Sequence, residues 1–135
     1  MIKNLTLFFL VTVICVNFKI LAQDLSQFQL QSGFKIEIFA NDLDSPRQMV
    51  EGKNGTIFVG ERGGQIVALS DSDRNGQVDS KRVIAESLTY STGVSMFKGD
   101  LYFSEISKIW KIKNVESWLL KNHSGLREKI LVADD

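Results

Sequence analysis

An internal repeat with a period of about 45 residues limits the possible folds of this chain more than any other feature of its sequence. Residues 43–69 align with residues 88–112, with apolar residues, glycines and acids in the same order. The matched pairs are Met49 with Val94, Gly55 with Gly99, Ile57 with Leu101, Val59 with Phe103, Glu61 with Glu105 and Ile66 with Ile109. We therefore interpret the chain as consecutive copies of one structural unit.

A second set of segments follows the same period. Each contains a basic residue, alternating apolar residues and an alanine followed by acids. The segments are residues 34–43, 81–88 and 128–135, with Ala40, Ala85 and Ala133 lying 45 and 48 residues apart. We predict a β-strand in each of them. Chance similarity between two β-meanders is the alternative explanation.

Within each copy the apolar residues alternate with other residues, as at Ile57 and Val59, which is the pattern of a half-buried strand. Turn sequences separate these stretches: Asn54-Gly55, Gly63-Gly64, Asn75-Gly76 and Lys98-Gly99-Asp100. Four short antiparallel strands in each unit of about 40–45 residues are typical of a propeller blade. The sequence therefore predicts an all-β chain that holds about two blades of a β-propeller and one strand of a third.

One segment departs from the strand pattern. Residues 114–122 carry Val115 and Trp118 at helical spacing, with Asn114 placed as an N-cap and Gly125 as a later stop signal. The sequence predicts a short helix inserted between two strands of the second blade.

Two blades do not make a closed propeller, because even the smallest propellers have about four blades. An open pair would leave an apolar face and a sheet edge uncovered. We therefore expect residues 23–135 to be the N-terminal part of a longer propeller domain. A complete small β protein is the alternative.

The first 22 residues have the layout of a secretory signal peptide. Lys3 precedes an uncharged apolar run, and Ala22 provides a small residue at the expected cleavage point. Cleavage there would also remove Cys15, the single cysteine, so the mature chain would fold without disulfides. We expect a periplasmic or secreted protein without a stable membrane span; an uncleaved anchor is the alternative.

The charge of the chain is balanced, with 16 basic and 16 acidic residues and a formal net charge of zero. Removal of the signal peptide takes away Lys3 and Lys19 and leaves a mildly acidic product. No electrostatic argument therefore favours nucleic acid or an anionic membrane as a partner.

The most specific local pattern is the acidic stretch of residues 71–79. Asp71, Asp73, Asn75 and Asp79 offer side-chain oxygens at the alternating spacing of a Ca²⁺-binding loop, and a glycine at its sixth position permits the sharp turn. The stretch is not an EF-hand, because an arginine stands at the position of the bidentate glutamate and strands rather than helices flank it. A polar hairpin turn closed by Asx hydrogen bonds is the alternative.

Other chemistry is sparse in this sequence. His123 is the only histidine and has no second metal ligand nearby in the sequence, so we interpret it as an exposed structural residue. Glu61 and Glu105 recur at matching positions of the repeat, which favours a structural hydrogen bond or ion pair over a catalytic base. The mature chain would have no thiol nucleophile, and no common hydrolase or nucleotide-binding signature occurs.

Four residues stand just before strands that would begin near a propeller's central channel: Arg47, Gln48, Ser91 and Thr92. Side chains at such positions can point into the channel. They are therefore the best candidates in this chain for contact with a cofactor.

Residues 33–79 and 102–112 together resemble the opening blades of the glucose/sorbosone dehydrogenase family, closest to its sorbosone dehydrogenase-like branch. The most telling segments are residues 55–69 (GTIFVGERGGQIVAL), the acidic Asn-Gly loop after them, and residues 101–112 (LYFSEISKIWKI). Their order and spacing carry the resemblance, because propeller repeats in general share similar short motifs. The resemblance extends over residues 33–135.

This resemblance implies a six-bladed propeller that holds pyrroloquinoline quinone (PQQ) near its axis, aided by Ca²⁺, and oxidises a sugar outside the cytoplasm. It also implies a histidine base that takes the proton of a sugar hydroxyl while hydride passes to the quinone, and a possible cytochrome as electron acceptor. In the family this histidine follows the strand matching residues 129–135. The catalytic base is therefore expected beyond Asp135, and His123 does not match it.

The sequence also departs from the family pattern. Glucose-oxidising members place an amide side chain that contacts the cofactor at the entry of the second blade, where this chain has Ser91 or Thr92. A Ca²⁺-dependent lactonase-like propeller and a non-catalytic binding propeller therefore stay open as alternatives. The first would need acids and asparagines that converge on a metal at the channel mouth, and the second would have no base. The two-blade piece alone is expected to be inactive.

Overall fold

The computed structural model describes residues 24–121 and 125–134 of the chain. The chain divides into two units, Met1–Ile36 and Glu37–Asp135. All the helices and strands described below belong to the second unit.

The first unit contains turns and irregular backbone, with neither helix nor strand, over its described residues 24–36. The predicted signal peptide, residues 1–22 with Cys15, lies outside the described residues. His123 lies outside them as well, so the predictions made for these positions stay predictions.

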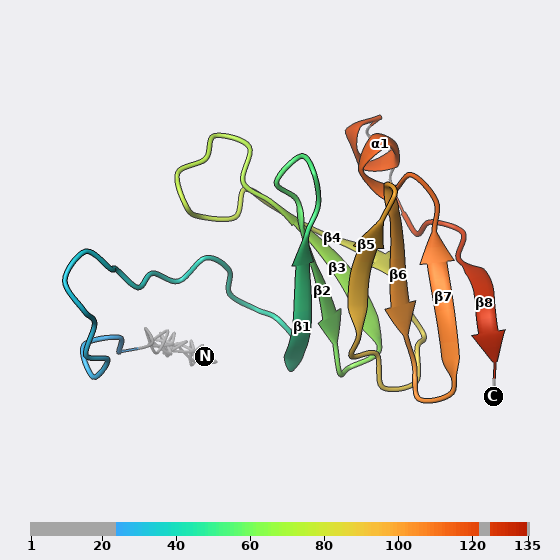
Figure 1. Cartoon of the computed structure of the whole chain (residues 1–135), viewed down its shortest axis with the longest axis horizontal. Coiled ribbons are helices and arrows are strands. Elements are labelled where there is room, and N and C mark those ends of the chain that lie inside the picture. Colours follow the sequence, from blue (N-terminus) through green and yellow to red (C-terminus); the bar gives the residue numbers. More distant parts are fainter. Residues whose placement is uncertain (1–23, 122–124, 135) are drawn as a thin grey trace, which may run out of the picture. The chain divides into compact units, whose positions relative to one another are not determined.

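The described residues form eight strands in two antiparallel four-stranded sheets (Figure 1). Sheet A contains β1 (Pro46–Glu51), β2 (Ile57–Glu61), β3 (Gln65–Ser70) and β4 (Ser80–Ala85). Sheet B contains β5 (Val94–Phe97), β6 (Asp100–Ser104), β7 (Lys108–Ile112) and β8 (Ile130–Asp134). In both sheets the strands lie side by side in sequence order. The prediction of a mostly β chain made of repeated antiparallel meanders is confirmed.

Two details of the predicted strand pattern are wrong. β8 does not begin a third unit, because it pairs with β7, with Ala133 opposite Ile109, and completes sheet B. Residues 34–43 form no strand, since no described strand of this chain offers their backbone a hydrogen-bonded ladder. The alternation of apolar residues predicts a strand but not the partner that it needs.

The predicted glycine turns join neighbouring strands. Gly55, Gly64 and Gly99 adopt φ angles of 85°, 94° and 86° in the β1–β2, β2–β3 and β5–β6 connections. These left-handed values are open to glycine at little cost and strain most other residues. The three glycines thereby allow the chain to reverse within a few residues.

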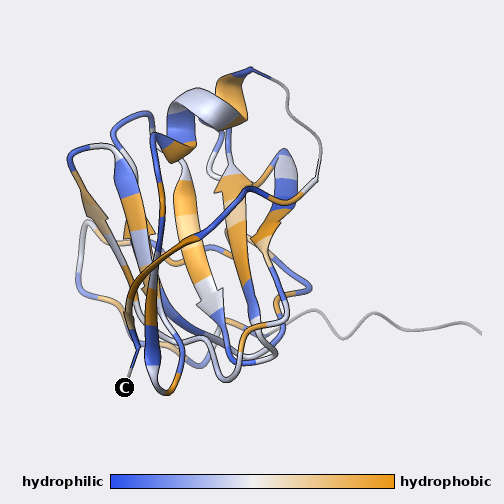
Figure 2. Ribbon diagram, turned by 90° about the vertical axis from the view of Figure 1, so that its right-hand side faces the viewer, coloured by the Kyte–Doolittle hydropathy of each residue, from blue (hydrophilic) through white to orange (hydrophobic). Residues whose placement is uncertain are grey.

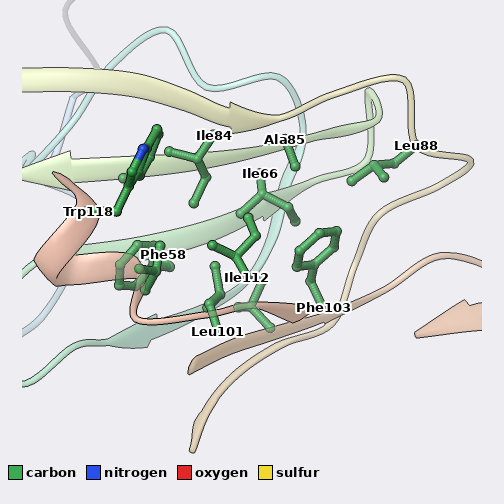
Figure 3. Close-up of a cluster of buried hydrophobic side chains, with 12 residues drawn as sticks. Phe58, Ile66, Ile84, Ala85, Leu88, Leu101, Phe103, Ile112 and Trp118 are labelled. Atoms are coloured by element: carbon green, nitrogen blue, oxygen red, sulfur yellow. The ribbon is translucent and has the colours of Figure 1, made fainter. Parts of the chain in front are cut away.

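One hydrophobic core lies between the two sheets (Figure 3). Its fully buried side chains include Phe58 and Ile66 from sheet A and Leu101, Phe103 and Ile112 from sheet B. Figure 2 shows hydrophobic residues along the strands and hydrophilic ones in most of the turns. Because strand residues alternate between faces, each sheet presents one apolar row to the other.

A second, smaller cluster covers the opposite face of sheet A. Its buried members are Val59, Val67 and Leu69, and residues 37–43 pack against them through apolar side chains. Sheet A is therefore apolar on both faces, which is typical of a sheet enclosed between two layers.

The predicted helix is present as α1 (Val115–Leu120), between β7 and β8. Val115 and Trp118 are buried against the core, as their spacing predicts. Asn114 is the N-cap residue, as predicted, although its φ is 45° and its side chain makes no capping hydrogen bond. No helix in the described part of the chain is long and apolar enough to cross a membrane.

Candidate metal site

The loop between β3 and β4 gathers the acidic residues of the predicted Ca²⁺ site. Asp71, Asp73 and Asp79 each place one carboxylate oxygen within 4.8 Å of the others. Figure 1 shows this loop extending away from the strands that it joins. Asp73 and Asp79 are exposed and Asp71 is half-buried. The structure thus brings together three of the four predicted ligands.

Backbone amides give the loop its shape. The N–H of Asn75 donates to carboxylate oxygens of both Asp71 and Asp73, at 3.1 Å each, and the N–H of Gly76 donates to Asp71 at 2.9 Å. Gly76 adopts a φ of 87° at the turn. These are the Asx hydrogen bonds expected of a polar turn, and they also hold two carboxylates on one side of it.

Asp79 approaches from the other end of the loop. Its Oδ2 atom accepts the hydroxyl and the backbone N–H of Ser72, the latter at 2.6 Å. These bonds, the hydroxyl first, lower the pKa of Asp79 below its usual value. The carboxylate therefore stays charged to lower pH than an ordinary aspartate.

Both polar atoms of the Asn75 side chain form hydrogen bonds within the loop. Its Oδ1 atom accepts the N–H of Gln77 at 2.8 Å, and its Nδ2 atom donates to Asp73 at 2.9 Å. Its side-chain oxygen thus serves the turn itself. The role of Asn75 as a fourth ligand stays a prediction.

The donor set suits a hard cation. Ca²⁺ binds oxygen ligands at about 2.3–2.6 Å, so two oxygens on the same ion lie at most about 5 Å apart. The carboxylate oxygens of Asp71, Asp73 and Asp79 meet this limit. An ion there would be held by three carboxylates on a tight turn, and it would fix the loop rather than take part in a reaction.

We expect Ca²⁺ to stabilise the folded chain through these carboxylates. At a free concentration one hundred times the dissociation constant, one bound ion would raise the free energy of unfolding by about 2.7 kcal/mol. Thermal unfolding in Ca²⁺ and in EDTA measures the shift. Asp71→Asn and Asp79→Asn should abolish it, whereas Glu128→Gln, an exposed carboxylate outside the loop, should leave it unchanged. Equal unfolding temperatures in Ca²⁺ and EDTA would contradict the site.

Glu61 and Glu105 have the structural role that their repetition predicts. An oxygen of Glu61 accepts the backbone N–H of Asp44 at 2.9 Å, and an oxygen of Glu105 accepts that of Thr89 at 2.6 Å. Each carboxylate thereby binds the connection that leads into the first strand of its own sheet. Neither is placed as a free base.

The second oxygens of these two glutamates differ. That of Glu105 accepts the indole N–H of Trp110. Burial alone would raise the pKa of Glu105, but the hydrogen bonds from Thr89 and Trp110 and nearby lysines lower it below its usual value. The second oxygen of Glu61, Oε2, is buried without a hydrogen-bond partner. Lys81 Nζ lies 3.8 Å from the other oxygen of Glu61, Oε1.

The four residues expected to face a channel lie where the first strands of the two sheets meet. Gln48 reaches across from β1, and its Oε1 atom accepts the N–H of Val94 at 3.0 Å. Ser91 is fully buried and its hydroxyl has no hydrogen-bond partner. Arg47 is exposed and Thr92 is half-buried. Gln48 therefore links β1 to β5, and Ser91 is buried rather than open to a ligand in this structure.

Glu116 is a buried carboxylate that no sequence pattern indicated. Its two oxygens accept the N–H groups of Lys53 and Asn54, each at 2.9 Å. It thereby ties α1 to the β1–β2 turn. A glutamate in the first turn of a short helix usually faces solvent, so its burial had no signal in the sequence.

The fold and the loop define a mostly β protein with two repeated antiparallel sheets and one acidic loop. The chain belongs to the family described as Domain of unknown function (DUF7133), whose model matches residues 21–117. It is similar to an uncharacterized protein of Borreliella burgdorferi, with 29% identity over 111 residues. That match covers 79% of this chain and 28% of the relative, so the chain spans little more than a quarter of the relative's length. No solved structure matches the chain.

Proposed function

We propose that sheets A and B are adjacent blades of a β-propeller, and that the chain is the N-terminal part of an exported PQQ-dependent sugar dehydrogenase. The observation that carries the first part is the arrangement of two sheets with the same strand order, whose first strands contact each other. The second part depends on the resemblance of residues 33–135 to that family.

The contact between the sheets fits the centre of a propeller. In a propeller the blades surround a central channel, so the innermost strands of neighbouring blades approach each other. β1 and β5 contact each other here, and β2 also contacts β5. Gly60 in β2 permits this approach, because a Cβ atom at this position would lie 2.9 Å from the carbonyl oxygen of Thr92.

In the proposed enzyme, the described residues would belong mainly to the propeller scaffold rather than to the reaction centre. Bound PQQ would supply the acceptor for the hydride of the sugar. Within residues 24–121 and 125–134, Gln48 is hydrogen-bonded to Val94, Ser91 is buried, and the acidic loop fits a Ca²⁺ ion. We therefore assign the histidine base and most quinone contacts to parts of the polypeptide outside these residues, and Arg47 and Thr92 stay the candidates within them.

Activity of the longest natural polypeptide that contains this sequence tests the proposal. Supplied with PQQ and Ca²⁺, it should reduce an artificial electron-accepting dye when an aldose is added, and the 135-residue chain should not. Omission of PQQ from the same protein is the matched control. A polypeptide that neither binds PQQ nor reduces the dye with any aldose would rule out the dehydrogenase, leaving the blade arrangement to be tested separately.

A further inference from the structure

Residues 37–43 lie against sheet A as β4 and the residues after it lie against sheet B. The three apolar side chains of the first segment that pack on sheet A match residues of the second with a shift of 45 residues: Phe39 with Ile84, Ala40 with Ala85 and Leu43 with Leu88. The surfaces that they cover match as well: the first set packs on Val59, Val67 and Leu69, and the second belongs to the cluster with Leu101, Phe103 and Ile112. The segment before sheet A thus occupies the position of a fourth strand.

The polar contacts of the two segments also repeat. The carbonyl oxygen of Phe39 accepts the N–H of Val78 at 3.0 Å, and that of Ile84 accepts the N–H of Arg127 at 3.1 Å. In each case the donor lies in the connection just before the fourth strand of the covered sheet. Backbone groups therefore hold both segments in the same place.

A lysine of each covered sheet makes the next matching contact. Lys81 donates to the carbonyl oxygen of Asp42, and Lys129, 48 residues later, donates at 3.3 Å to that of Glu86, one residue before the counterpart of Asp42. The two lysines occupy equivalent places in the repeat of residues 81–88 and 128–135. The resemblance between the two segments thus includes a lysine contact from the sheet that each segment covers.

The backbone conformation after the two segments is the same. Positive φ angles of non-glycine residues recur with a shift of 45 residues: Asp42 (58°) with Ser87 (57°), and Ser45 (53°) with Tyr90 (58°). Such angles are uncommon outside glycine, so their recurrence at equivalent positions shows one shared conformation. The carboxylates of Glu61 and Glu105 hold the two connections in the same way.

One difference between the two segments remains. β4 is hydrogen-bonded to β3 in sheet A. β1 and β2 of the same sheet contact β5, whose first residue Val94 is only 6% exposed. Within residues 24–121 and 125–134 no such sheet adjoins residues 37–43, and Met49, the counterpart of Val94, is 71% exposed. The apolar surface left open on sheet A is thus the part that the first strands of a preceding sheet would cover.

We propose that residues 37–43 are the fourth strand of a further antiparallel sheet, and that its other three strands come from a distant part of the same polypeptide and cover Met49. This inference rests on the blade arrangement proposed above and is independent of sugar oxidation. A strand contributed from one end of a protein to a sheet formed by another part would close the ring of sheets. The Borreliella burgdorferi relative, of which the chain covers 28%, has ample length for such strands.

Thiol labelling tests whether Met49 is covered. We would introduce Met49→Cys, and separately Ser117→Cys on the exposed side of α1, into a Cys15→Ser background. In the longest natural polypeptide, the thiol of Met49→Cys should react with an alkylating reagent at least about tenfold more slowly than that of Ser117→Cys. In the 135-residue chain the two thiols should react at comparable rates. Hydrogen exchange of the amides of residues 37–43 should slow in the longer polypeptide by a similar factor.

Two results would overturn this assignment. Equal labelling rates of the two variants in the longer polypeptide, with unprotected amides in residues 37–43, would show that no strands join this segment. Protection of Met49→Cys in the 135-residue chain that increases with protein concentration would assign the covering strands to a second copy. Protection in the longer polypeptide without any sugar oxidation would support the fourth strand and remove only the dehydrogenase.

Discussion

Replacement of Phe58 by alanine is expected to lower the free energy of unfolding by about 3–5 kcal/mol. Phe58 has no exposed surface and belongs to the core that sheets A and B share (Figure 3). The substitution removes a large apolar side chain and leaves a cavity that the surrounding sheets can fill only in part. Urea unfolding followed by circular dichroism measures the change.

Phe97 provides the matched control. It is also a phenylalanine in a strand, but 60% of its surface is exposed. Phe97→Ala should change the free energy of unfolding by less than about 0.5 kcal/mol, since surface substitutions are usually small in effect. Similar losses for Phe58→Ala and Phe97→Ala would contradict a core placed between the two sheets.

Gly64→Ala should destabilise the chain by about 2–4 kcal/mol, the sum of a left-handed backbone cost and a steric one. Gly64 has a φ of 94°, and a Cβ atom there would lie 2.4 Å from the carbonyl oxygen of Leu88. The carbonyl oxygen of Gly64 also accepts the N–H of Leu88 at 3.1 Å, which keeps the two backbones together. The backbone would have to move to admit the methyl group.

Gly55→Ala separates the two costs. Gly55 has a φ of 85°, but a Cβ atom added there would meet nothing within 4 Å. Its replacement should cost only about 1 kcal/mol, as expected for alanine at a glycine conformation. Thermal or urea unfolding of both variants gives the difference, and equal losses would show that Leu88 does not approach Gly64 as described.

The strands and turns of this chain were largely predictable because they depend on local patterns. Alternation at Ile57 and Val59 marks a strand, and Asn54-Gly55 marks a turn whatever surrounds them. The sheet that a strand joins depends on distant partners. For that reason the sequence did not show that β8 completes sheet B, or that residues 34–43 lack a ladder.

At the candidate metal site, too, the local spacing was predictable and the contacts with other groups were not. The spacing of Asp71, Asp73 and Asp79 predicted their convergence, because a turn of nine residues brings alternate side chains together. The orientation of Asn75 was not predictable, since its amide can donate or accept and the nearby N–H of Gln77 takes its oxygen. Glu116 is buried only because the β1–β2 turn lies beside α1.

The position of β4 has a consequence for how the chain can come apart. β4 is hydrogen-bonded to sheet A, yet Ile84 and Leu88, at its end and just after it, belong to the core shared with sheet B. The residues that form sheet A therefore also supply part of the core that belongs to sheet B. A break in the chain between the two sheets would divide this shared core, so insertions, duplications and proteolytic boundaries in such a protein should fall elsewhere than at the visible border between the sheets.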